Sequence, residues 1–138
     1  MENLINTLQE KIGITLENYM FKVESGKIRE LALAIGDLKD EYLNGKKILP
    51  TFPTVIDFWD GGKSTMELLG LNKKKVLHGE QEYEYLIEIK PGDLITVQSV
   101  LENAFTKASM DFFVVKREYF NEKGEKVLIS RSTVIERH

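Results

Sequence analysis

The stretch 76–89 most constrains the fold of this chain. From position 82 onward, apolar and acidic residues alternate: Tyr83, Tyr85, Ile87 and Ile89 share one face, and Glu82, Glu84 and Glu88 share the other. A period of two is typical of a β-strand with one buried side. A type II turn at Pro91-Gly92 is expected to end it, because proline presets φ and glycine accepts a positive φ. The chain then reverses into a strand from Leu94.

Further strands are expected in the second half of the chain, near 94–102, 109–120 and 126–135. The segment 121–124 predicts a tight hairpin between the last two strands, with Gly124 at the position that needs a positive φ. In the first half, 14–23 is typical of a short strand or an extended lead-in. The pattern therefore predicts a mainly antiparallel sheet.

Helices are expected before residue 70. Apolar spacing predicts a short helix over 4–12 that ends at Gly13, and a firmer one over 26–35, with Ser25 as its N-cap and Gly36 ending it. Pro53 fits the first turn of another helix, which carries the apolar stripe of 55–59. A short helix near 64–69 follows.

Helices gathered early and antiparallel strands gathered late predict an α+β domain, with one helical layer on one curved sheet. With 138 residues, the chain is expected to form a single domain over 1–138. A single small sheet leaves edge strands exposed, so dimerisation is expected to cover them.

Composition narrows the function classes. The chain has no cysteine, which excludes disulfides and thiolate metal sites, and its net charge of −3 gives no general attraction to nucleic acid. Lys73-Lys74-Lys75 is read as a solvated loop. No apolar run approaches the ~20 residues of a membrane span. We expect a soluble, cytoplasmic protein without membrane or nucleic-acid partners.

Four segments in order carry a family resemblance: 26–32, 34–37, 50–55 and 77–81 running on to 91–93. Through them the chain resembles the MaoC-like hot-dog dehydratases, and in particular the amino-terminal, non-catalytic half of their double hot-dog members. The resemblance implies a hot-dog fold, in which an antiparallel sheet wraps around a central helix that here begins near Pro53.

The resemblance also implies a reaction of fatty acid metabolism, the reversible removal of water from an (R)-3-hydroxyacyl thioester of coenzyme A or acyl carrier protein. This chemistry needs a base for the α-proton, an acid for the departing hydroxyl and donors for the enolate oxygen. The resemblance implies no cofactor.

The catalytic halves of the family supply acid and base from a Gly-Asp-x-Asn-Pro-x-His loop. Aligned on Gly36, this chain keeps Asp37 but has Lys39 for Asn, Asp40 for Pro and Tyr42 for His. A tyrosine hydroxyl ordinarily titrates near pH ~10 and is a poor base at neutral pH. No catalytic residue is therefore expected, although Asp37 and Tyr42 occupy the family's Asp/His positions. The other interpretation of these two residues is structural, as a turn residue and a packed ring.

Candidate substrate-binding residues form one segment: Pro50, Thr51, Phe52, Pro53 and Thr54. They could line an acyl channel, although helix entry explains the prolines equally well. His78 and Gln81 are weaker candidates for a pocket or a subunit interface. A metal site is not expected, because His78 is the only internal histidine.

The leading hypothesis is an accessory hot-dog subunit of a dehydratase or enoyl-CoA hydratase, inactive alone, whose catalytic MaoC-like partner carries the Asp/His pair. The alternative is a homodimer that binds acyl-CoA without chemistry. A third interpretation, an acyl thioesterase, would need an acidic residue or a glutamine placed against the thioester carbonyl from the central helix. Asp57 and Asp60 are the only acidic residues of that stretch.

Overall fold

The computed structural model describes residues 8–58 and 65–138 and contains one five-stranded antiparallel sheet. Its strands are β1 (Thr15–Lys22), β2 (Val76–Tyr85), β3 (Leu94–Lys107), β4 (Met110–Phe120) and β5 (Lys126–Arg137). Their spatial order is β1-β3-β4-β5-β2, so β1 and β2 are the two edge strands.

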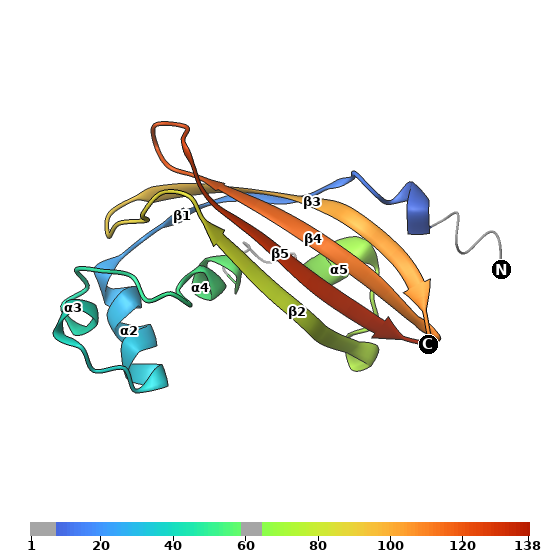
Figure 1. Ribbon diagram of the computed structural model, residues 1–138, viewed down its shortest axis with the longest axis horizontal. Coiled ribbons are helices and arrows are strands. Elements are labelled where there is room, and N and C mark those ends of the chain that lie inside the picture. The colour runs from blue at the N-terminus through green and yellow to red at the C-terminus, as the bar shows by residue number, and fades with distance from the viewer. Residues whose placement is uncertain (1–7, 59–64) are drawn as a thin grey trace.

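The helices lie on one side of the curved sheet and beyond one end of it (Figure 1). They are α2 (Ser25–Ile35), α3 (Asp40–Leu43), α4 (Pro53–Phe58) and α5 (Thr65–Leu69), followed by the 3-10 turn η1 (Lys73–Lys75). The helix α4 lies under the concave face of the sheet, whereas α2 and α3 pack together at the end (Figure 1). This is the hot-dog arrangement that the resemblance implied.

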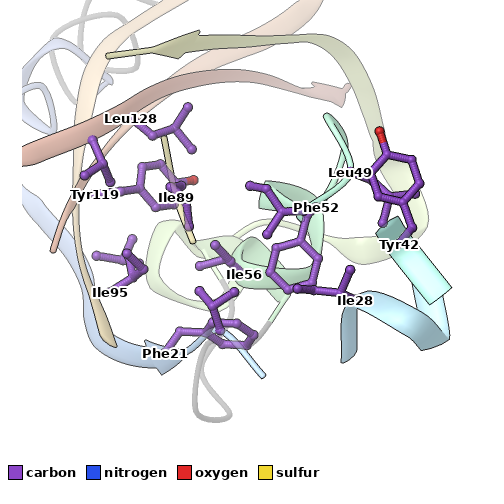
Figure 2. Close-up of a cluster of buried hydrophobic side chains, with 14 of the residues drawn as sticks. Phe21, Ile28, Tyr42, Leu49, Phe52, Ile56, Ile89, Ile95, Tyr119 and Leu128 are labelled. Carbon is purple, nitrogen blue, oxygen red and sulfur yellow. The ribbon is translucent and has the colours of Figure 1, made fainter. Parts of the chain in front are cut away.

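The main apolar core forms where α4 meets the sheet. Phe52 and Ile56 are completely buried, and Figure 2 shows them among side chains from β1, α2, β3 and β5. The rings of Phe21 and Phe52 meet edge to face, with centroids 6.2 Å apart. Pro53 begins α4 as predicted, since the first turn of a helix needs no amide hydrogen there. The central helix is thus held by its own apolar stripe.

A second, smaller core lies farther along the same face of the sheet. It consists of Leu16, Leu69, Leu101, Ala104, Phe113 and Val115. On β3 the two cores are separated by buried Ser99, and on β4 by buried Arg117. These two positions face each other in the β3–β4 register. Polar residues thus cross the sheet between two apolar clusters.

Most predicted elements are confirmed. Strands lie at all five expected places, and α2, α4 and α5 coincide with the expected helices. Gly36 ends α2 in the left-handed conformation, and Gly92 and Gly124 have the positive φ angles their turns require. Of the helix expected over 4–12, residues 8–10 are helical, and 1–7 lie outside the described residues.

Three predicted element boundaries are wrong. The N-cap of α2 is Glu24, and the Ser25 hydroxyl instead donates to the carbonyl oxygen of Gly45 at 3.0 Å. The strand expected to reach Ile89 ends at Tyr85, because the next two amides both bond to the carbonyl oxygen of Val127 and bend the chain. The strand β3 extends five residues past its expected end, because it continues through a bulge after Leu101.

A β-bulge at Gly79 changes which residues of β2 share a face. His78 pairs with Val134 and Glu80 with Thr133, so these two β2 residues lie on opposite faces of the sheet. Strict alternation along the sequence would put them on the same face. No helix among the described residues is long and apolar enough to cross a membrane.

Candidate functional site

The loop that aligns with the family's catalytic motif is a structural turn here. The Asp37 carboxylate accepts from the amide of Lys39 at 3.4 Å, and α3 begins directly afterwards. Tyr42 is only 6 % exposed and belongs to the main core, and the Lys39 ammonium lies 5.8 Å from its ring centroid. Asp37 thus lies at a turn and Tyr42 is packed in the core, the contacts that the structural interpretation expects.

Beside this loop lies an apolar pocket of about 310 Å³, lined by Tyr42, Lys47, Ile48, Leu49, Pro50, Tyr85, Glu88 and Ile89. Most of its walls are hydrocarbon, and the hydroxyl of Tyr85 donates to the carbonyl oxygen of Pro50 across it. Burial, and secondarily the charge of Asp57, raises the pKa of Tyr85 to about 12, so its hydroxyl stays protonated at neutral pH. Pockets of this size and lining suit apolar ligands.

The candidate segment 50–54 is divided between the pocket and the helix start. Pro50 lines the pocket, whereas Phe52 and Pro53 are buried at the start of α4 and Thr51 is exposed. The hydroxyl of Thr54 lies 3.0 Å from that of Tyr83. One of the five predicted residues therefore faces the pocket directly.

His78 and Gln81 lie on the edge strand β2, both exposed. The Gln81 side chain accepts from the hydroxyl of Ser132 at 2.6 Å, and its amide nitrogen donates to the carbonyl of Arg131 at 3.5 Å. Gln81 thereby belongs to the network described next, and neither residue lines the pocket beside Tyr42.

A network of polar side chains joins α4 to the concave face of the sheet. We call it the polar band, and its members are Thr54, Asp57, Gln81, Tyr83, Arg117, Tyr119, Ser130 and Ser132. Asp57 is its centre: Tyr119 donates to Oδ1, and Tyr83 donates to Oδ2 at 3.1 Å. Arg117 of the band lies in the row that separates the two apolar cores, whereas Tyr119 belongs to the main core.

The hydrogen positions in the band follow from these contacts. A tyrosine hydroxyl has one proton to donate. Because Tyr83 and Tyr119 give theirs to Asp57, Thr54 must donate to Tyr83 at 3.0 Å, and Ser130 must donate to Tyr119 at 3.1 Å. Each carboxylate oxygen of Asp57 thus has a donor, so the carboxylate is held as an acceptor.

Burial is the dominant effect on the charge of Asp57. It raises the pKa of this carboxyl, and the positive charge of Arg117 and the two tyrosine hydrogen bonds counteract part of the rise. Burial likewise raises the pKa of Tyr83 and of Tyr119, and the Asp57 charge adds to both. Both hydroxyls therefore remain protonated donors at neutral pH.

The sequence analysis found Asp57 only as a weak thioesterase candidate and missed its partners. One signal was present: Arg117 and Tyr119 follow Phe113 and Val115 at every second position of β4, on the same buried face. A buried arginine needs hydrogen-bonding or charged partners. Asp60, the second acid considered, lies outside the described residues.

Chemically, the band is suited to fixing α4 to the sheet. Asp57 of α4 accepts a hydrogen bond from Tyr83 of β2 on one carboxylate oxygen and from Tyr119 of β4 on the other. No group of three or more His, Asp or Glu side chains that could hold a metal ion occurs within 8–58 and 65–138.

Comparison with known proteins identifies the family of this fold and site. A family model described as "FAS1-like, dehydratase domain region" matches residues 10–130. The chain belongs to this FAS1-like dehydratase family. It is also similar to UPF0336 proteins of Streptomyces avermitilis and Streptomyces coelicolor, with 32 % and 31 % identity over 128 residues and 85 % of each chain covered.

Solved structures agree on the fold of this FAS1-like dehydratase family member. The chain is similar to the C-terminally truncated HadBC (3R-hydroxyacyl-ACP dehydratase) complex of Mycobacterium tuberculosis, with a TM-score of 0.71, 16 % identity, and 91 % and 96 % of the two chains covered. For the ChsH1-ChsH2 complex of the same organism the TM-score is 0.70 and the identity is 13 %, with 99 % of this chain and 90 % of that chain covered. For a MaoC-like dehydratase of Rhodospirillum rubrum the TM-score is 0.66 and the identity is 16 %, with 92 % of each chain covered. The hot-dog fold expected from the sequence is confirmed.

Proposed function

We propose that this chain is a non-catalytic, amino-terminal-type hot-dog subunit of an (R)-3-hydroxyacyl-thioester dehydratase or enoyl-CoA hydratase. Its residues 1–138 form one domain that shapes the acyl pocket, and a MaoC-like partner chain supplies the Asp/His pair. The substrate class is an acyl thioester of coenzyme A or acyl carrier protein, handled in the cytoplasm without a cofactor.

The observation that carries the proposal is the position of Tyr42. Where the family's catalytic loop has its histidine, this chain has a ring that is 6 % exposed and forms a wall of the 310 Å³ pocket. The same loop therefore contributes binding surface in place of a proton-transfer group. Asp37, which aligns with the family's aspartate, bonds to a backbone amide instead.

Two kinds of relative support a hetero-oligomer. The HadBC and ChsH1-ChsH2 structures, which share the fold of this chain, are described as complexes. Under this proposal the division of labour is simple: apolar contacts in the pocket of this chain hold the acyl tail, and the partner's side chains take the α-proton and protonate the hydroxyl.

The proposal is tested with the isolated chain and with the chain copurified with its native partner. We expect no hydration of crotonyl-CoA by the chain alone and clear hydration by the complex. Robust turnover by the isolated chain would contradict the proposal, as would a native complex that contains no other hot-dog protein.

A pocket variant tests the acyl-binding role within that complex. Ile48→Trp places a large ring in the pocket wall and should reduce hydration of long-chain enoyl-CoA while sparing crotonyl-CoA. Leu33→Trp is the matched control, because Leu33 is 53 % exposed on α2 and lies outside the pocket. If Ile48→Trp leaves the ratio of long-chain enoyl-CoA to crotonyl-CoA hydration unchanged, this pocket does not bind the acyl chain.

The apolar pocket also favours a second candidate, a homodimer that binds acyl-CoA without chemistry. Native mass spectrometry separates the two functions. A homodimer that retains acyl-CoA and needs no partner supports the second candidate, and a mixed complex supports the first.

A further inference from the structure

Two tyrosines line the pocket beside α3, and only one of their hydroxyls has a partner. The hydroxyl of Tyr85 donates to the carbonyl oxygen of Pro50. The hydroxyl of Tyr42 forms no hydrogen bond with any residue that the structure describes, and the one charged group near its ring is the Lys39 ammonium. The donor and acceptor capacity of Tyr42 is therefore unused within the described chain.

This unpaired hydroxyl belongs to a buried side chain. Tyr42 is 6 % exposed. A buried tyrosine ordinarily places its hydroxyl against a hydrogen-bond partner, because a polar group that is removed from water and left unpaired destabilises the fold. Tyr119, which is completely buried, follows this rule through Asp57 and Ser130. Tyr42 departs from it, so its partner is expected outside the protein.

The position of the hydroxyl leads to the pocket. The ring of Tyr42 packs in the main core and forms part of the pocket wall. In Figure 2 its oxygen lies at the end of the ring that points away from Ile28 and Phe52. The pocket has a volume of about 310 Å³, which is within the range of small-molecule sites. An atom of a ligand in this pocket can therefore supply the missing partner.

The remaining lining restricts the chemistry of that ligand atom. Buried Ile48, Leu49 and Ile89 provide apolar walls. Lys47 and Glu88 are exposed and carry opposite charges, so the lining has no net charge. Burying a carboxylate in such a site is costly, because no net positive charge offsets it. The lining therefore favours an apolar ligand that carries an uncharged oxygen.

We propose that Tyr42 is a ligand-binding residue whose hydroxyl forms a hydrogen bond with one uncharged oxygen of the acyl group in the pocket. An acyl thioester offers such an oxygen at its head, as the thioester carbonyl or a 3-hydroxyl, or farther along its chain, as a hydroxyl or keto group. The proposal rests on the acyl-binding function proposed above, and it adds a specific polar contact to the apolar ones.

Four coenzyme A conjugates with the same chain length test this contact. Decyl-CoA is a thioether without oxygen on its chain, and decanoyl-CoA adds the thioester carbonyl. The other two, 3-hydroxydecanoyl-CoA and 10-hydroxydecanoyl-CoA, add a hydroxyl near the head or at the far end. We expect one of these additions to tighten binding to the full chain by about three- to tenfold in isothermal titration calorimetry. The addition that does so identifies the position of the recognised oxygen.

The variant Tyr42→Phe should lose this gain and bind decyl-CoA as wild type does, because it keeps the ring and removes only the hydroxyl. A purely structural role of Tyr42 would change the affinity for all four conjugates alike. The difference between conjugates that do and do not carry the oxygen therefore reports the hydrogen bond itself.

Thermal stability provides a second readout, with Tyr119→Phe as the matched control. Because the Tyr42 hydroxyl has no partner in the described protein, Tyr42→Phe should keep or raise the melting temperature. Tyr119→Phe removes a hydroxyl that bonds to Asp57 and Ser130, so its melting temperature should fall by about 2–8 °C. Tyr119 lies outside the pocket lining, so this variant should retain the gain from the ligand oxygen.

Three results would overturn the proposal. In the first, Tyr42→Phe binds every conjugate as wild type does, which means that water satisfies the hydroxyl. In the second, wild type binds none of the conjugates or binds all four with equal affinity. In the third, Tyr42→Phe lowers the melting temperature as much as Tyr119→Phe does, which means that the hydroxyl has a partner in the protein.

The proposed function and this contact can fail separately. If Tyr42 recognises a ligand oxygen but no complex of this chain hydrates enoyl-CoA, the binding site stands and the accessory function does not. If the native complex is active and Tyr42→Phe binds all four conjugates as wild type does, the accessory function stands and the contact is wrong.

Discussion

Asp57 has two opposite effects on the stability of the fold. Burial penalises its charge, and the hydrogen bonds from Tyr83 and Tyr119 compensate by giving each oxygen a donor. Asp57→Ala leaves two largely buried hydroxyls without their acceptor, so it should lower the free energy of unfolding by about 2 kcal/mol or more. Asp57→Asn keeps one acceptor and removes the charge, and should cost less than about 1 kcal/mol. Urea denaturation at pH 7 compares them. Equal losses would show that the hydrogen bonds are unimportant.

The pH dependence of stability follows from the same residue. The pKa of Asp57 is raised above its ordinary value of 3.8, so the folded state holds this proton to a higher pH than the unfolded state does. This group's contribution to stability is therefore largest below pH 3.8 and is lost as the pH rises through the raised pKa. Relative to wild type, Asp57→Asn should gain stability as the pH rises through that window. A difference between the two proteins that does not change with pH would contradict the raised pKa.

Tyr42→His tests whether the missing imidazole alone explains the lack of catalysis. The new side chain would be placed in a nearly closed core site next to Lys39, without the asparagine and proline of the family's loop. We expect no crotonyl-CoA hydration and a lower melting temperature than that of Tyr42→Phe, which keeps the ring. Measurable hydration by the isolated histidine variant would show that the loop retains a catalytic geometry.

At the scale of elements, the contact between the end of α3 and the start of α2 depends on Gly45. Its φ is +63°, and a Cβ there would lie 2.4 Å from the Cβ of Ser25 and 2.8 Å from the Ser25 carbonyl oxygen. Gly45→Ala should therefore destabilise the protein by roughly 2–5 kcal/mol, from backbone strain and overpacking together.

The matched control for that variant is Gly36→Ala. Gly36 also has a positive φ, of +75°, but a Cβ there meets nothing within 4 Å. Only backbone strain should remain, about 1–2 kcal/mol. Thermal unfolding followed by circular dichroism distinguishes the two. If both variants lose the same free energy of unfolding, the close approach of residue 45 to Ser25 does not contribute to the loss.

Elements with a regular period were predictable, because the alternation in 76–89 and the helical spacing in 26–35 depend only on near neighbours. The order β1-β3-β4-β5-β2 was not read from them, since strand pairing links residues far apart in sequence. The same limit hid the polar band: Asp57 and Tyr119 are 62 residues apart. The bulge at Gly79 likewise shifted the faces of β2 after a correct strand prediction.

On the scale of the whole molecule, the strands cross two apolar cores with the polar band between them. On β3, Val97 belongs to the main core and Leu101 to the smaller one, with Ser99 between them. The backbone pairing of β3 with β4 and of β4 with β5 continues from one core into the other. The two cores should therefore unfold together, even though their side chains are separated.

Two matched truncations test this coupling. Leu128→Ala opens a cavity in the main core and Leu101→Ala opens one in the smaller core, both at fully buried positions. Each should lower the free energy of unfolding by about 2–5 kcal/mol, with one transition seen in both far-ultraviolet and near-ultraviolet circular dichroism and an unchanged denaturant slope. If Leu101→Ala instead produces an early transition that leaves the main core folded, the polar band is a boundary between two units. In that case the sheet does not make the two cores unfold cooperatively.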